Sequence, residues 1–115
     1  MEGPVRFDVY AMPIAEHLEE ARSVVAQVRP ERTRADILKL FHQSRRHSKL
    51  LCVGTSLGWA EARSLELKLA RCFSKLAIYQ EGYGPDCAEC SYCETHQLRY
   101  TGCLGCHVCN QRFEE

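Results

Sequence analysis

Two cysteine triplets near the C-terminal end constrain this chain more than any other feature. They read CAECSYC over residues 87–93 and CLGCHVC over residues 103–109, so each has the spacing C-x2-C-x2-C. A C-x2-C turn places two thiolates on one side of a knuckle, where both reach one tetrahedral ion. A disulfide-stapled tail and an iron–sulfur cluster are the alternatives, but the opening MEGPVRFD lacks a signal-peptide apolar run, which favours a reducing compartment. We therefore expect the tail to bind zinc.

The triplets and two nearby histidines supply as many ligands as two tetrahedral zinc ions need. One arrangement joins the first two cysteines of each triplet around one ion and leaves the remaining cysteines and histidines for a second. The alternative joins the last two cysteines of each triplet around a single ion, and the sequence does not choose between one ion and two. Four protein ligands leave no open position, so a structural zinc is expected rather than a catalytic one. The candidate ligands are Cys87, Cys90, Cys93, His96, Cys103, Cys106, His107 and Cys109.

The tail is too short to fold around an apolar core of its own. A structural zinc ion supplies the missing free energy, on the order of 10 kcal/mol in zinc-finger peptides. GYGPD, residues 82–86, reads as a hinge. We therefore predict a helical domain over residues 1–81 and a zinc-stabilised cysteine-rich module over residues 87–115.

The apolar spacing of the first eighty residues indicates helices. Residues 14–29 carry a stripe at steps of three and four between two prolines, and a second helix is expected to start at Thr33, whose hydroxyl can cap it. A long third helix is predicted over residues 56–80, while LLCV at residues 50–53 suits a strand or a helix end. The predicted fold class is therefore mainly α: a small helical bundle with a C-terminal cysteine-rich zinc-binding tail. The long helix is either the centre of that bundle or the contact surface of a homodimer.

The formal net charge is zero, but basic residues concentrate in the middle of the chain. The densest segment is SRRHSK, residues 44–49, and four more cations fall within one arc of the predicted third helix. Such a surface is either merely solvated or binds RNA phosphates without sequence preference, and SRRHSK also suits a nuclear or nucleolar address. The candidate RNA-binding residues are Arg32, Arg34, Arg45, Arg46, Lys49, Arg63, Lys68, Arg71 and Lys75.

Taken together, a small helical N-terminal part, the basic segment SRRHSK and the two cysteine triplets resemble the cysteine-rich RNA-silencing suppressors of rod-shaped plant RNA viruses. The opening MEGPVRFDVY is most similar to the benyvirus members. The resemblance implies a viral protein that suppresses host RNA silencing, binds RNA, self-associates, and visits the nucleolus as well as the host cytoplasm. It puts the RNA and nucleolar role on Arg45, Arg46 and Lys49, and the zinc role on Cys87, Cys90, Cys93, His96, Cys103, Cys106 and Cys109.

The sequence contains neither a phosphate-binding glycine loop nor paired carboxylates in an apolar setting, so we do not expect an enzyme. Its apolar runs are too short for a membrane span. The alternative to an RNA-binding suppressor is an adaptor that docks host silencing proteins without functional RNA contact. A third possibility, redox activity or metal buffering, would require exchangeable thiols.

Overall fold

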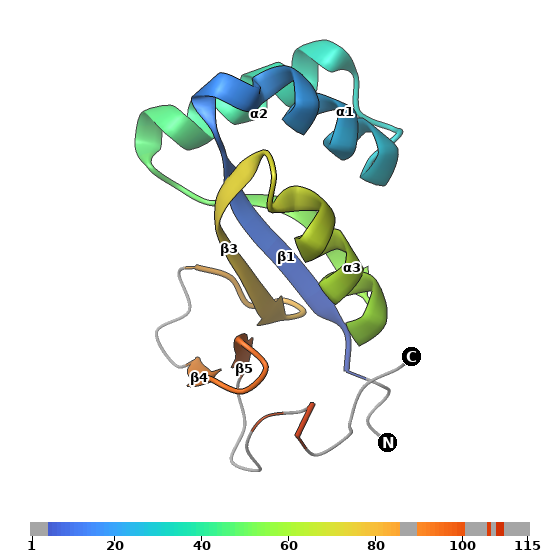
Figure 1. Ribbon diagram of the computed structural model, residues 1–115, viewed down its shortest axis with the longest axis vertical. Helices are drawn as coiled ribbons and strands as arrows, with labels where there is room; N and C mark the ends of the chain where they lie inside the picture. Colours follow the sequence, from blue (N-terminus) through green and yellow to red (C-terminus); the bar gives the residue numbers. More distant parts are fainter. Residues whose placement is uncertain (1–4, 86–89, 101–105, 107, 110–115) are drawn as a thin grey trace.

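The computed structural model describes residues 5–85, 90–100, 106, 108 and 109. Within them the chain is an α/β protein with a five-stranded mixed sheet and three helices (Figure 1). Strands account for 31% of the described residues, so the predicted helical bundle is wrong. The elements are β1 (Phe7–Pro13), the 3-10 turn η1 (Ala15–His17), α1 (Leu18–Val28), α2 (Arg34–His47), β2 (Leu51–Leu57), α3 (Trp59–Leu69), β3 (Phe73–Gln80), β4 (Ser91–Cys93) and β5 (Leu98–Tyr100).

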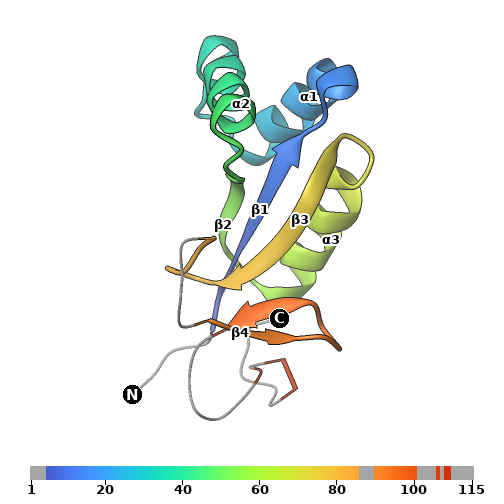
Figure 2. The same cartoon turned by 90° about the vertical axis from the view of Figure 1, so that its left-hand side faces the viewer.

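The sheet is built around the first strand of the chain. Its order is β2-β1-β3-β5-β4, and every neighbouring pair is antiparallel except β3 and β5, which run parallel. Alternate β1 residues Phe7, Val9 and Ala11 are fully buried in the core. Figures 1 and 2 show α3 along one face of β1 and β3, with α1 and α2 gathered beyond one end of the sheet.

Two predicted helices and one predicted strand option are confirmed. Helix α1 lies within the expected range, and α2 begins directly after Thr33. The Thr33 hydroxyl accepts a hydrogen bond from the Asp36 N–H at 3.1 Å, which satisfies one of the free donors at a helix start. The LLCV segment enters β2, so the strand reading of that segment is the right one.

The predicted third helix over residues 56–80 is wrong in its second half. Helix α3 ends at Leu69, the Cys72 N–H donates to the Leu69 carbonyl at 3.0 Å, and the chain continues as β3. Ile78 is fully buried on this strand, between β1 and β5. The apolar side chains of β3 that the prediction placed on a long helix are therefore buried in a sheet. Homodimerisation stays a prediction.

A buried carboxylate ties three segments of the fold together. Asp8 on β1 is 5% exposed. It accepts hydrogen bonds from the Thr55 hydroxyl at 2.8 Å and the Ser56 N–H at 3.0 Å, both on β2. Its second oxygen accepts from the Gly82 N–H at 3.2 Å, in the turn that follows β3. Asp8 therefore fixes the edge strand β2 and the turn after β3 relative to β1.

The C-terminal strands belong to the same sheet. Leu98 on β5 lies beside Ile78 on β3 and is fully buried, and Cys106 and Val108 also pack into the hydrophobic core. The sheet thus continues past the hinge predicted at residues 82–86. No helix in the described part of the chain is both long and apolar enough to cross a bilayer.

Candidate metal centre

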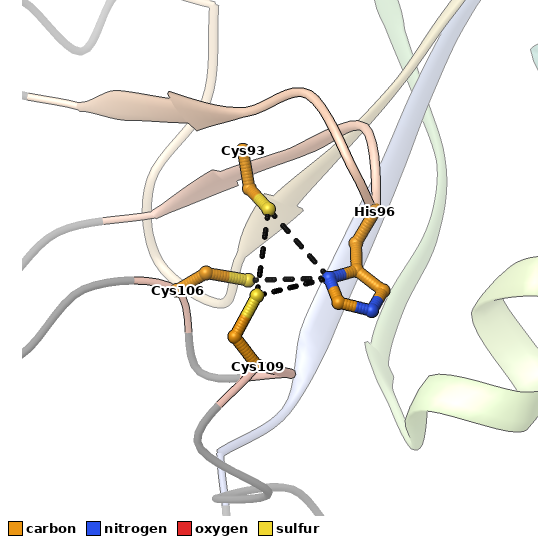
Figure 3. Close-up of side chains that lie close together, drawn as sticks. All are labelled: Cys93, His96, Cys106 and Cys109. Atoms are coloured by element: carbon orange, nitrogen blue, oxygen red, sulfur yellow. Dashed lines mark hydrogen bonds between the residues drawn. The ribbon is translucent and has the colours of Figure 1, made fainter.

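Three cysteines and one histidine from the tail point toward a common centre. Cys93 ends β4, His96 lies in the turn between β4 and β5, and Cys106 and Cys109 come from the segment that follows (Figure 3). Their ligand atoms all lie within 4.8 Å of one another, close enough to hold a metal ion.

The His96 ring presents its Nδ1 atom to all three sulfurs. Nδ1 lies 3.6 Å from the Sγ of Cys93, 3.7 Å from that of Cys106 and 3.4 Å from that of Cys109. The Sγ atoms of Cys93 and Cys109 are 3.8 Å apart. Four soft or borderline donors thus surround one position, which is the donor set of zinc and related transition-metal sites.

Local strand pairing explains how the first two ligands meet. Cys93 and Leu98 are partners in the β4–β5 hairpin, and the left-handed conformation of Gln97 (φ 53°) closes the turn between them. This turn brings His96 back toward Cys93. Trp59 of α3 packs edge-on to the His96 ring, with 6.0 Å between ring centres, so the helix supports the imidazole.

Burial differs across the cluster. Cys106 is 6% exposed, Cys109 is exposed, and Cys93 and His96 are half-buried. Desolvation opposes ionisation of Cys93, but hydrogen bonds from the His96 backbone and ring and from the neighbouring thiols lower the pKa of Cys93 to about 6. Desolvation, together with Cys93 and Cys106, raises the pKa of Cys109 to about 11. The lowered pKa of Cys93 favours the thiolate that a metal ion requires, whereas the ion would have to displace the proton of Cys109.

The cluster differs from both predicted ligand sets. It takes the last two cysteines of the second triplet but only the last cysteine of the first, and His96 completes it. Cys90 is half-buried and disulfide-bonded, and it is not one of the four. The predicted ligands Cys87, Cys103 and His107 lie outside the described residues. Trp59 was not predicted as a site residue, because no spacing in the sequence relates it to His96.

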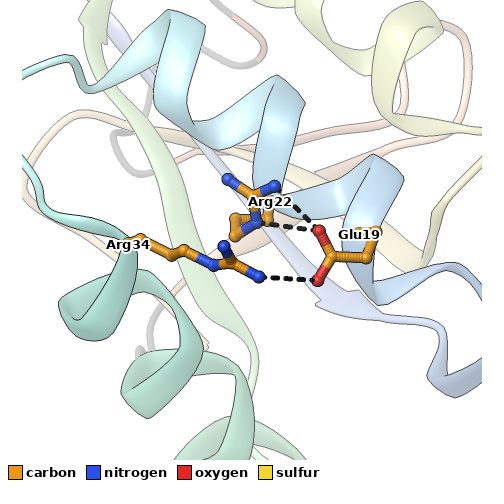
Figure 4. Close-up of polar contacts among 3 residues, drawn as sticks. All are labelled: Glu19, Arg22 and Arg34. Atoms are coloured by element: carbon orange, nitrogen blue, oxygen red, sulfur yellow. Dashed lines mark hydrogen bonds and ion pairs between the residues drawn. The ribbon is translucent and has the colours of Figure 1, made fainter.

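The predicted RNA-binding residues divide into two groups. Arg34, Arg63 and Arg71 form ion pairs with Glu19 at 3.5 Å, Glu66 at 2.8 Å and Glu20 at 3.7 Å. Figure 4 shows Glu19 held between Arg34 and Arg22. Carboxylates therefore offset much of the positive charge of this group.

The second group consists of the remaining cations, of which all but Arg32 are exposed. Arg45, Arg46 and Lys49 lie at the C-terminal end of α2 and just beyond it, and none of them has an ion-pair partner within the described residues. Lys68 and Lys75 are likewise exposed, while Arg32 is half-buried.

The cationic arc predicted on one long helix does not form as such. Arg63 and Lys68 lie on α3, but Arg71 follows the end of that helix and Lys75 lies on β3. The change of structure at Leu69 is the physical reason, because a period of 100° per residue applies only within a helix.

Comparison with family models, with curated proteins and with solved structures returned no match to this chain.

Proposed function

We propose that this chain is a zinc-stabilised RNA-binding regulatory protein, without enzymatic activity, that acts as a plant-virus suppressor of RNA silencing. The observation that carries the zinc assignment is the spacing of the four donor atoms. Zinc bonds of about 2.3 Å to sulfur and 2.0–2.1 Å to nitrogen give a tetrahedron with edges of about 3.8 Å between sulfurs and about 3.6 Å between sulfur and nitrogen. Here the Cys93 and Cys109 sulfurs are 3.8 Å apart, the three sulfur–nitrogen distances are 3.4–3.7 Å, and all four donor atoms lie within 4.8 Å of one another.

The role of the ion in this proposal is structural. Three thiolates and one imidazole fill a tetrahedral coordination shell and leave no position for a substrate. Strands β4 and β5 are three residues each, too short to persist without support. The ion would fix this hairpin to the segment that carries Cys106 and Cys109.

Metal content tests the zinc assignment directly. Elemental analysis of reduced, purified protein should find zinc, and Cys109→Ser should weaken zinc binding by more than about 100-fold. Cys52→Ser is the matched control, because Cys52 is a free, half-buried thiol outside the cluster. Protein without metal, or a C109S variant that holds zinc as tightly as the wild type, would contradict the assignment.

The RNA-binding part of the proposal rests on the exposed cations at the end of α2. Arg45, Arg46 and Lys49 are free to meet phosphates, because their charges are not offset within the described residues. Contacts of this kind give salt-sensitive affinity with little sequence preference. We propose silencing suppression because the sequence resembles viral suppressors. The same resemblance implies a nucleolar and cytoplasmic location in the host cell and a homodimer.

Two triple variants with the same loss of charge separate RNA binding from a general charge effect. R45A/R46A/K49A should lose RNA affinity and silencing suppression in a leaf reporter assay. R34A/R63A/R71A removes cations that already pair with glutamates, so it should retain most of both. Equal suppression by the wild type and R45A/R46A/K49A would refute RNA contact as the basis of suppression.

One observation favours the adaptor as a second candidate function. A pocket of about 520 Å³ between α1 and α2 is lined by Leu18, Leu38, Phe41, His42, Arg45 and Arg46. Its apolar floor and basic rim suit an apolar side chain flanked by acidic residues in a partner protein. Leu38→Ser should abolish capture of such a peptide while leaving RNA affinity unchanged. A Leu38→Ser variant that still captures the peptide but loses RNA affinity would exclude the adaptor.

A further inference from the structure

A second pocket adjoins the end of the basic segment. It has a volume of about 420 Å³ and lies beside Tyr10 of β1, between the chain that follows α2 and the turn that follows β3. We propose that this pocket binds one unstacked base of single-stranded RNA, with Tyr83 as the stacking surface and Lys49 on the adjoining phosphate. This inference rests on the RNA-binding function proposed above and names the form of RNA and the site that reads it.

The first wall of the pocket is held by reciprocal hydrogen bonds. The Lys49 N–H donates to the Ser44 carbonyl at 3.0 Å, and the Ser44 hydroxyl donates to the Lys49 carbonyl. Ser48 between them adopts a left-handed conformation (φ 52°) that ends α2. Lys49 is thus fixed at the pocket entrance while its side chain stays exposed.

The second wall is the turn after β3. The Gly82 N–H binds the buried Asp8 carboxylate, and the Tyr83 N–H donates to the Gln80 carbonyl at 3.1 Å. Gly82 has a φ of 88°, which favours glycine. Tyr83 is 38% exposed, so part of its ring is accessible to a base that enters the pocket.

Tyr10 contributes a polar group to the lining of the pocket. Gly84 lies so near Tyr10 that an added Cβ would be 2.9 Å from the phenol oxygen. Burial, the charges of Cys52 and Asp8 and a hydrogen bond with Cys52 raise the pKa of Tyr10 to about 12, so the phenol keeps its proton at neutral pH. A base edge entering the pocket would meet this hydroxyl.

The charge and the shape together favour a nucleotide. Among the described residues, those lining the pocket include two tyrosines and a lysine but no carboxylate. Bases stack on aromatic side chains at about 1–3 kcal/mol per base, and the phosphates follow nearby cations. Arg45 and Arg46 lie in the last turn of α2, four and three residues before Lys49. A duplex cannot supply this contact, because its bases are already stacked and paired.

The test uses the full chain and three labelled RNAs in fluorescence anisotropy: a short single strand, the same sequence as a duplex, and an abasic strand of equal length. Tyr83→Ala should weaken binding of the single strand about 30-fold, the middle of the range for one lost stack, without changing affinity for the other two RNAs. Tyr83→Phe should bind like the wild type. Tyr92→Ala is the matched control, since Tyr92 is 45% exposed but outside the pocket.

Each result distinguishes this inference from the function on which it rests. If wild-type protein binds none of the three RNAs, the proposed function and this site both fail. If wild-type protein binds RNA but Tyr83→Ala matches it, or if the abasic strand binds as tightly as the normal single strand, only the base-binding pocket is refuted. Unchanged circular dichroism of Tyr83→Ala would show that any loss of affinity is not a loss of fold.

Discussion

Removal of the Asp8 carboxylate is expected to destabilise the whole sheet. Asp8→Ala deletes three hydrogen bonds, to the Thr55 hydroxyl and to the N–H groups of Ser56 and Gly82. The donors belong to solvent-exposed residues, so water replaces part of each bond. At about 1 kcal/mol net for each bond, the loss is about 3 kcal/mol, a large part of the 5–15 kcal/mol that stabilises a typical domain.

Urea unfolding measures this loss. The fluorescence of Trp59, the only tryptophan, reports on α3, and circular dichroism reports on the sheet and helices. Thr55→Val is the graded control, because it removes one of the three hydrogen bonds and should cost about 1 kcal/mol. If Asp8→Ala unfolds within about 0.5 kcal/mol of the wild type, the carboxylate does not hold these segments together, and our reading of the junction is wrong.

Three further predictions concern single side chains. Leu98→Ala should lower the unfolding free energy by about 2–5 kcal/mol in the same urea assay, because Leu98 is fully buried; a loss near zero would mean that β5 is not part of the core. Thr33→Ala should cost about 0.5–2 kcal/mol through loss of the cap on α2, and Thr33→Ser, which keeps the hydroxyl, should restore most of it. In an absorbance titration, one of the five tyrosines should ionise near pH 12 and the step should vanish in Tyr10→Phe. Folding raises this pKa from 10.0, so the protonated phenol contributes to the free energy of unfolding. This contribution is complete below pH 10 and is lost as the pH rises through 12.

Sequence reasoning located α1 and α2 because their signals are local. Each has apolar residues at steps of three and four, and α2 also has a capping threonine. Strand β1 was not predicted, although Phe7, Val9 and Ala11 occupy every second position, as the core-facing residues of a half-buried strand should. That signal was available, and Gly3, Pro4 and Pro13 border the segment, but the alternating stretch is only a few residues long.

The error at β3 has a different cause. Apolar residues from Leu69 to Tyr79 fit steps of three and four, and neither glycine nor proline marks the end of α3. The strand does not alternate either, because the left-handed conformation of Lys75 (φ 55°) accompanies a shift in its register with β1. A bulge of this kind erases the period of two by which a strand is recognised.

The cysteine triplets predicted which residue types form the site better than which individual residues form it. Ligand types and the general position follow from spacing alone, but the choice of His96 depends on the β4–β5 turn. That turn forms where β5 pairs with β3, and such a long-range contact cannot be read from ligand spacing.

The position of β1 between two later strands has a consequence for how the protein is made. Phe7 is paired with Leu57 on one side and with Gln80 on the other. At about 5–20 residues per second, the ribosome needs roughly 4–15 s after making Phe7 to deliver Gln80. Throughout that interval the nascent chain carries the strand that will be most buried without both of its neighbours, so the sheet closes late in translation and chaperones have time to engage this segment first.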